Sequence, residues 1–229
     1  MLDQARKRAS RRKSFWRIAR RICCLLVLLP IGGCTSVFEL PVAIPDIFDS
    51  FDVTSDAWEL KQNAKTDQHI SNGALRIEVL DTNYPALSIL NTGPVSPEFV
   101  CEALGFIGND YNGVGSWGIC WGAPRTGTYT AVMLRSDGKY SVRKRTPSVG
   151  WTDIVDWTFH SSIKQDAGPN TIRIETSSNS VSVYVNDINL GEHPVTAFPH
   201  AEFAVVAECT AGDRDIVAIC KWFLLDCDR

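Results

Sequence analysis

The sequence predicts an all-β protein, a two-sheet antiparallel sandwich of the jelly-roll type, over residues 46–229. Apolar and polar side chains alternate with period two in short segments such as 75–79 and 181–185, which is typical of half-buried strands. Turn-forming pairs separate these segments, namely Asn72-Gly73, Asp137-Gly138 and Asn186-Asp187. No window after Cys34 shows three turns of helical apolar spacing, so we expect no long helix in this domain.

Residues 1–33 have the organisation of a secretory signal peptide. Nine Lys or Arg residues lie within the first 21 positions, an apolar run follows over 22–31, and Gly32-Gly33 precedes Cys34. A basic start, a short apolar run and small residues at a cleavage site describe such a signal. The run is about half as long as a bilayer-spanning helix, so we do not expect a membrane-spanning anchor.

The ending Ile31-Gly32-Gly33-Cys34 resembles a bacterial lipobox. This resemblance implies lipidation at Cys34, with palmitate among the expected acyl chains, and cleavage that leaves Cys34 as the first residue. An ordinary secretory signal in which Cys34 has no role is the alternative. Residues 34–45 would form a short tether, in which Pro41 and Pro45 favour extended backbone. The expected location is extracytoplasmic in the bacterial cell envelope, on the outer membrane where there are two.

The charge of the chain changes when the predicted signal is removed. Residues 34–229 contain 14 basic and 25 acidic residues, a net charge of about −11. Nucleic-acid binding depends on Lys and Arg that neutralise phosphates, so nucleic acid is not an expected partner. About 195 residues suffice for one domain with its own core.

Landmark segments follow one another in a characteristic order. They are 48–51 (Phe-Asp-Ser-Phe), Trp58, Asn72-Gly73, 98–103, 117–123, 129–140, 150–157, 170–174, 183–187 and 221–226. This order resembles the concanavalin A-like lectin/glucanase superfamily, in particular the laminin-G-like modules of bacterial surface proteins, over about residues 46–227. The resemblance implies that the first and last strands pair, with Phe48, Phe51, Trp222 and Leu224 in the core.

The glycan-cleaving relatives resemble one another in a strand that carries Glu, then Asp two residues on, then Glu three residues further. This sequence has no such spacing. Glu98 and Glu102 share a strand face without a third carboxylate, and Asp153 and Asp156 point to opposite faces. A Gly-x-Ser-x-Gly elbow and zinc-ligand spacings are also absent from the sequence. We therefore assign no catalytic residue.

Residues 109–113 read Asn-Asp-Tyr-Asn-Gly. Their oxygen ligands and flexibility suit a Ca²⁺ loop, but the same residues also make a good turn. We expect no cofactor, with calcium as the alternative.

Aromatic and arginine side chains form the candidate ligand-binding set. Aromatic rings stack on the apolar faces of sugars, and arginine bonds their hydroxyl groups. The set comprises Trp117, Trp121, Tyr129, Arg135, Tyr140, Arg143 and Trp151. Tryptophans of a sandwich are mostly core residues, so we expect two or three members on the surface. The basic cluster 143–145 presents its two arginines on one strand face and Lys144 on the other.

These observations predict a membrane-anchored module that binds a glycan or another surface polymer. A sugar-processing enzyme on the same fold is one alternative. A structural envelope protein that binds protein partners is another.

The domain contains five cysteines: Cys101, Cys120, Cys209, Cys220 and Cys227. Export permits disulfides, and an odd number leaves at least one thiol free or paired between chains. Cys209 and Cys220 flank a predicted turn, and Cys101 and Cys120 lie on consecutive strands. Either pairing, or buried thiols, is consistent with the sequence.

Overall fold

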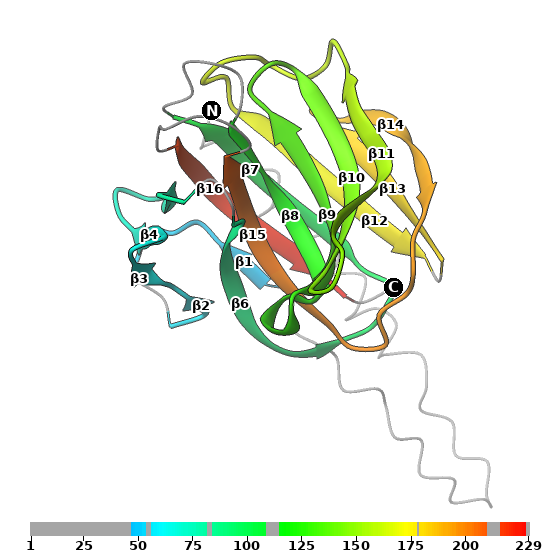
Figure 1. The fold of residues 1–229 in the computed structure, drawn as a ribbon, viewed down its shortest axis with the longest axis horizontal. Helices are drawn as coiled ribbons and strands as arrows, with labels where there is room; N and C mark the ends of the chain where they lie inside the picture. Colours follow the sequence, from blue (N-terminus) through cyan, green and yellow to red (C-terminus); the bar gives the residue numbers. More distant parts are fainter. Residues whose placement is uncertain are drawn as a thin grey trace, which may run out of the picture. The chain divides into compact units, whose positions relative to one another are not determined.

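The computed structural model describes residues 47–53, 56–81, 84–108, 115–177, 179–209 and 216–227. The predicted signal, Cys34, the tether and the 109–113 loop lie outside these residues. The described residues belong to one compact unit, Ala43–Arg229. They form two antiparallel sheets (Figure 1), which confirms the predicted all-β sandwich. No helix in this part of the chain is long and apolar enough to cross a membrane.

One sheet has nine strands, in the order β14-β13-β12-β7-β16-β5-β4-β3, with β1 paired to β16. The bounds are β1 Ile47–Asp49, β3 Gln62–Asn63, β4 Thr66–Ile70, β5 Leu75–Val79, β7 Val100–Ile107, β12 Asn170–Ser177, β13 Ser180–Val185, β14 Ile188–Pro194 and β16 Ile216–Asp226.

The other sheet has seven strands, in the order β11-β10-β9-β8-β15-β6-β2. Their bounds are β2 Trp58–Glu59, β6 Ala86–Val95, β8 Gly115–Ala123, β9 Thr128–Arg135, β10 Lys139–Thr146, β11 Gly150–Phe159 and β15 Ala201–Cys209. A short 3-10 turn, η1 (Pro124–Thr126), joins β8 to β9.

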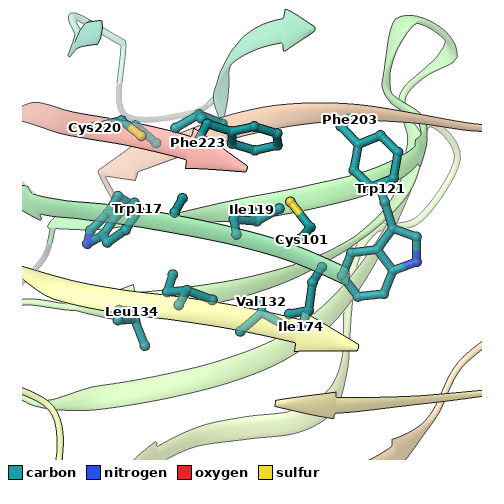
Figure 2. Close-up of a cluster of buried hydrophobic side chains, with 14 of the residues drawn as sticks. Cys101, Trp117, Ile119, Trp121, Val132, Leu134, Ile174, Phe203, Cys220 and Phe223 are labelled. Carbon is teal, nitrogen blue, oxygen red and sulfur yellow. The ribbon is translucent and has the colours of Figure 1, made fainter. Parts of the chain in front are cut away.

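Side chains from alternate positions of both sheets fill the space between them. The seven-stranded sheet contributes Trp117, Ile119 and Trp121, and the nine-stranded sheet contributes Cys101 and Phe223 (Figure 2). All five are at most 2% exposed. This is the burial that period-two alternation predicts for a sandwich.

The first described strand is fixed to the last one. β1 pairs with the end of β16, which confirms the pairing implied by the family resemblance. After β1, the Asp49 carboxylate accepts hydrogen bonds from the backbone N–H of Phe51 (2.7 Å) and from Trp58 Nε1 (2.9 Å). These bonds accompany a positive φ of 55° at Phe51, whose ring is buried against Trp58. Asp49 thus stabilises a backbone conformation that a bulky residue rarely adopts.

A β-bulge corrects one expectation about the core. Along β16 the residues in the core between the sheets are even-numbered up to Cys220 (Ile216, Ala218, Cys220), and odd-numbered from Phe223 onward (Phe223, Leu225). The register shift between Cys220 and Trp222 adds one residue, which transfers the following side chains to the opposite face. Phe223 and Leu225 therefore occupy the core, whereas Trp222 and Leu224 are half-buried.

Of the other two side chains expected in the core, Phe51 and Phe48, one is in the core and the other is not. Phe51 lies in the core as expected. Phe48 is only half-buried, and its ring lies 6.4 Å from that of Trp222.

The predicted turns are present. Asn72 and Gly73, and likewise Asn186 and Asp187, have positive φ angles, as a two-residue hairpin turn requires. Asn170 opens β12 and bonds the local backbone through its side chain, at Lys164 N, Lys164 O and Gly168 O. The amide of Asn186 donates to Asn170 Oδ1 as well, at 2.8 Å. Asn170 therefore joins the loop before β12 to the hairpin after it.

The cysteine pairings considered from the sequence are not formed. Cys101, Cys120 and Cys220 are buried free thiols. Cys101 faces the core from the nine-stranded sheet, whereas Cys120 lies on the other face of the seven-stranded sheet. Cys209 and Cys220 lie on β15 and β16, which belong to different sheets. Burial raises the pKa of all three free thiols, so they stay protonated and unreactive.

Replacing Asn170 with alanine should lower the free energy of unfolding by about 2–4 kcal/mol, because buried backbone groups lose their partners. Asn179→Ala, at an exposed position, is the matched control, with an expected change within about 0.5 kcal/mol. Urea denaturation monitored by tryptophan fluorescence measures both. Equal effects of the two variants would contradict the structural role of Asn170.

Candidate functional site

The outer face of the seven-stranded sheet is apolar and buried at its centre. Since Trp117, Ile119 and Val132 point into the core, the alternate residues of these strands point outward. The outward cluster consists of Ile89, Cys120, Tyr129, Ala131, Met133, Ala204 and Val206, none more than 1% exposed. Trp151 and Trp157, from the edge strand β11, pack against it. Aromatic side chains therefore cover a face that the sandwich alone leaves open.

A buried carboxylate holds this cover in place. Glu208 of β15 accepts a hydrogen bond from Trp151 Nε1 at 2.7 Å through Oε1. Its other oxygen, Oε2, lies 3.3 Å from Arg143 Nη1. Arg143 Nε donates to Asp153 Oδ1 at 2.6 Å. We call Arg143, Trp151, Asp153, Trp157 and Glu208 the Trp151 cluster.

The cluster spans the sheet. Strands β8, β9 and β10 lie between β15, which carries Glu208, and β11, which carries Trp151. The bond between these two residues therefore ties the edge strand to the middle of the sheet.

Arginine side chains lie against the tryptophan rings. The Arg143 guanidinium carbon is 4.7 Å from the ring centroid of Trp151 and 5.8 Å from that of Trp157. Arg135 is 5.0 Å from the Trp157 ring and donates to Asp137 at 2.9 Å. Such cation–π contacts, combined with ion pairs, fix both rings and guanidinium groups in orientation.

Burial has the largest effect on the pKa of Glu208. The pKa of this carboxyl group is raised because burial disfavours its charged form, although Arg143 and the Trp151 hydrogen bond lower it in part. Its side chain is 11% exposed. At Asp137 the balance is reversed: the hydrogen bond from Arg135 lowers the pKa of that carboxyl group.

Two hydroxyl groups on this face have no hydrogen-bond partner among the described residues. They are Tyr129 Oη and Ser141 Oγ, and both residues are fully buried. The Tyr129 ring meets Trp151 edge-on at 5.5 Å. Burial raises the pKa of Tyr129, so its hydroxyl group stays protonated. Buried hydroxyl groups without a hydrogen-bond partner are uncommon. Tyr129 and Ser141 therefore leave unused hydrogen-bonding capacity on this face of the sheet.

The structure divides the seven predicted ligand-binding residues into two groups. Tyr129, Arg135, Arg143 and Trp151 come together on the outer face of the seven-stranded sheet. Trp117, Trp121 and Tyr140 lie in the core between the sheets. The shared face of Trp117 and Trp121 is thus the inner one.

Sequence reasoning missed Glu208 as a member of this region, and it considered Asp153 only as a catalytic carboxylate. Glu208 carried a usable signal, because it is the only charged residue in the apolar run 203–209. A carboxylate at such a position requires a partner. Glu98 and Glu102 lie apart from the cluster, before and within β7 of the nine-stranded sheet.

Both carboxylates of the cluster are engaged. Each oxygen of Glu208 has its own donor, and Asp153 shares Arg143 with Glu208. A retaining glycosidase uses one carboxylate as nucleophile and a second as acid and base.

Within the described ranges no group of three or more metal-ligating side chains occurs.

No protein-family model matches the chain, and no curated protein matches it in sequence. Solved structures do match its fold. The carbohydrate-binding module CBM66 from Bacillus subtilis superposes with a TM-score of 0.55 at 10% identity, over 72% of this chain and 92% of its own. The β-glucanase of Bacillus licheniformis gives 0.54 at 13% identity, over 79% and 97%. The chain has the concanavalin A-like jelly-roll fold.

A third structure comes from work on endo-acting O-glycanases that human gut microbiota express to initiate mucin breakdown. It matches with a TM-score of 0.57 at 11% identity, over 79% of this chain and 98% of its own. Both binding modules and glycan-cleaving enzymes therefore share this jelly roll. At such identities the likeness concerns the fold, and the function must be argued from the side chains of the site.

The buried carboxyl group predicts a pH dependence of stability. Because the pKa of Glu208 is raised in the folded state, its contribution is full below the unfolded pKa and falls as pH rises through the folded pKa. The free energy of unfolding of the wild type, relative to Glu208→Gln, should therefore decrease as the pH rises above about 4, the ordinary pKa of a glutamate carboxyl group. Urea denaturation at each pH measures this difference. An increase with pH would show that the ion pair with Arg143 outweighs burial.

Proposed function

We propose that this protein is a carbohydrate-binding module and that its saccharide site is the Trp151 cluster. The observation that carries the proposal is the half-exposed Trp151 ring, which donates a hydrogen bond to Glu208 from its indole nitrogen and makes an edge-to-face contact with Tyr129. Indole rings offer flat apolar surface to the CH faces of sugars, and polar groups around them bond hydroxyls.

Preorganisation supports this role. The Trp151 side chain is fixed before any ligand arrives, so binding costs little side-chain entropy. Trp157 is half-exposed beside it, and Asp153 is exposed and offers a carboxylate as acceptor for sugar hydroxyls. The similar structures named above, a carbohydrate-binding module and a β-glucanase, support a saccharide ligand.

The engagement of Glu208 and Asp153 with Arg143 favours binding over cleavage, because neither carboxylate is available as a free nucleophile. A sugar-processing enzyme remains the second candidate. Incubation of a bound polymer with the full chain, followed by measurement of reducing ends, distinguishes the two. New reducing ends that disappear in Glu208→Gln would establish the enzyme.

The binding proposal predicts that Trp151→Ala weakens saccharide binding by about tenfold or more, through loss of the stacking surface. The matched control is Tyr184→Ala, which removes a half-exposed aromatic ring from the nine-stranded sheet and should leave affinity within about twofold. A glycan array with the full chain, with and without calcium, identifies the ligand and tests the 109–113 loop. Equal binding by both variants would refute the assignment of this face.

We also propose that the protein is a lipoprotein of the bacterial cell envelope, anchored through Cys34 and tethered by residues 34–45. Expression with an alkyne-labelled fatty acid should label the wild type. Cys34→Ser should lose the label, whereas Cys23→Ser, within the predicted signal, should retain it. Equal labelling of the Cys34→Ser variant would exclude this attachment site.

A further inference from the structure

Four arginines border the outer face of the seven-stranded sheet, and three of them are bound to carboxylates. Arg125 pairs with Glu202 and with Glu59, Arg135 pairs with Asp137, and Arg143 pairs with Asp153 and Glu208. The fourth, Arg145, has no carboxylate within ion-pair distance among the residues that the structure describes. In a domain with a clear excess of acidic residues, an unpaired arginine on this face requires an explanation.

Arg145 lies beside the aromatic surface. On β10 it shares the outward face with Arg143 two residues before it, since Val142, the residue that precedes Arg143, is buried in the core. Its register partners on the neighbouring strands are Trp151 of β11 and Tyr129 of β9. Arg145 is therefore a cationic neighbour of both Trp151 and Tyr129 in the sheet.

The Arg145 side chain is positioned by packing and not by an ion pair with a described carboxylate. It is half-buried, and its Nη1 lies 3.4 Å from the point that a Cβ on Gly127 would occupy. Gly127 has a φ of +79°, which glycine adopts without strain. The guanidinium group thus lies close to the backbone between η1 and β9, where its donors remain uncommitted to any carboxylate.

The positive charge of Arg145 affects the pKa values of two buried groups of this face, Tyr129 and Glu208. It lowers the pKa of the Tyr129 hydroxyl group and of Glu208, against the larger effect of burial on each. The Tyr129 hydroxyl itself has no partner among the described residues. A ligand oxygen in this region would find a guanidinium group that no described carboxylate neutralises.

We propose that Arg145 binds an anionic substituent of the saccharide, a carboxylate or a sulfate, while the sugar ring stacks on Trp151. This inference rests on the proposed function and names its ligand class, an acidic glycan. A guanidinium group forms two parallel hydrogen bonds with either anion. Arg143 does not fill this role, because Asp153 and Glu208 already neutralise it.

The test compares charged and neutral members of matched pairs, by calorimetric titration of the full chain. Oligogalacturonate and its methyl ester form the carboxylate pair, and dextran sulfate and dextran form the sulfate pair. We expect the chain to prefer the charged member of one pair by about 10- to 100-fold. Which pair shows the preference decides between carboxylate and sulfate.

Arg145→Gln should abolish this preference and leave binding of the neutral member within about twofold, since the variant breaks no ion pair with a described residue. Lys144→Gln is the matched control, because it removes the same charge from the opposite face of the same strand. It should retain the preference. Circular dichroism and thermal unfolding verify that both variants are folded.

Three outcomes would overturn the inference. Equal affinity for charged and neutral members would exclude an acidic glycan and leave the saccharide site of Trp151 standing. Equal losses in Arg145→Gln and Lys144→Gln would show non-specific attraction of an anion. Failure of every saccharide on the array and in the titrations to bind would remove the proposed function itself, and the inference with it.

Discussion

The hydrogen bond from Trp151 to Glu208 is the interaction on which the candidate site depends. It connects β11, at the edge of the seven-stranded sheet, with β15, from which β11 is separated by three strands. Glu208 is buried in an apolar strand, where an isolated carboxylate is costly. Trp151 and Arg143 satisfy both of its oxygens, and in doing so they are held over the outer face of the sheet.

This arrangement gives the sandwich a second apolar layer. The core between the sheets contains one set of alternate residues, and the cluster around Met133 contains the other set. Strands β8, β9 and β15 are consequently buried on both faces, which explains why they read as almost continuous apolar runs. The tryptophans of β11 cover the second layer and face solvent with their remaining surface. The proposed binding surface and the packing of the second apolar layer thus depend on the same tryptophan side chains.

Much of the fold was predictable, because its signals are local. Period-two alternation indicated the strands, and Asn72-Gly73 and Asn186-Asp187 indicated hairpins through the positive φ that these residues accept. The bulge between Cys220 and Trp222 was not predictable, since apolar residues on both sides of it fit either register. That single extra residue exchanged Trp222 for Phe223 in the core.

The site was less predictable than the fold. Alternation placed Trp117 and Trp121 on one face, but an apolar environment on both faces hid which face was the inner one. Glu208 and Trp151 are 57 residues apart in the chain, and only the strand order brings them together. Arg143 and Arg145 look equivalent in the sequence. They differ because Arg143 pairs with two carboxylates, whereas Arg145 pairs with none among the described residues.

The central claim is that the outer face of the seven-stranded sheet, around Trp151, is the saccharide-binding surface. Nuclear magnetic resonance of the full chain with ¹⁵N-labelled tryptophan tests it directly, in a titration with the saccharide bound most tightly on the array. The indole N–H signals of Trp151 and Trp157 should shift and saturate, whereas those of the buried Trp117 and Trp121 should stay in place. Saturable shifts confined to Trp222, on the nine-stranded sheet, would contradict the account.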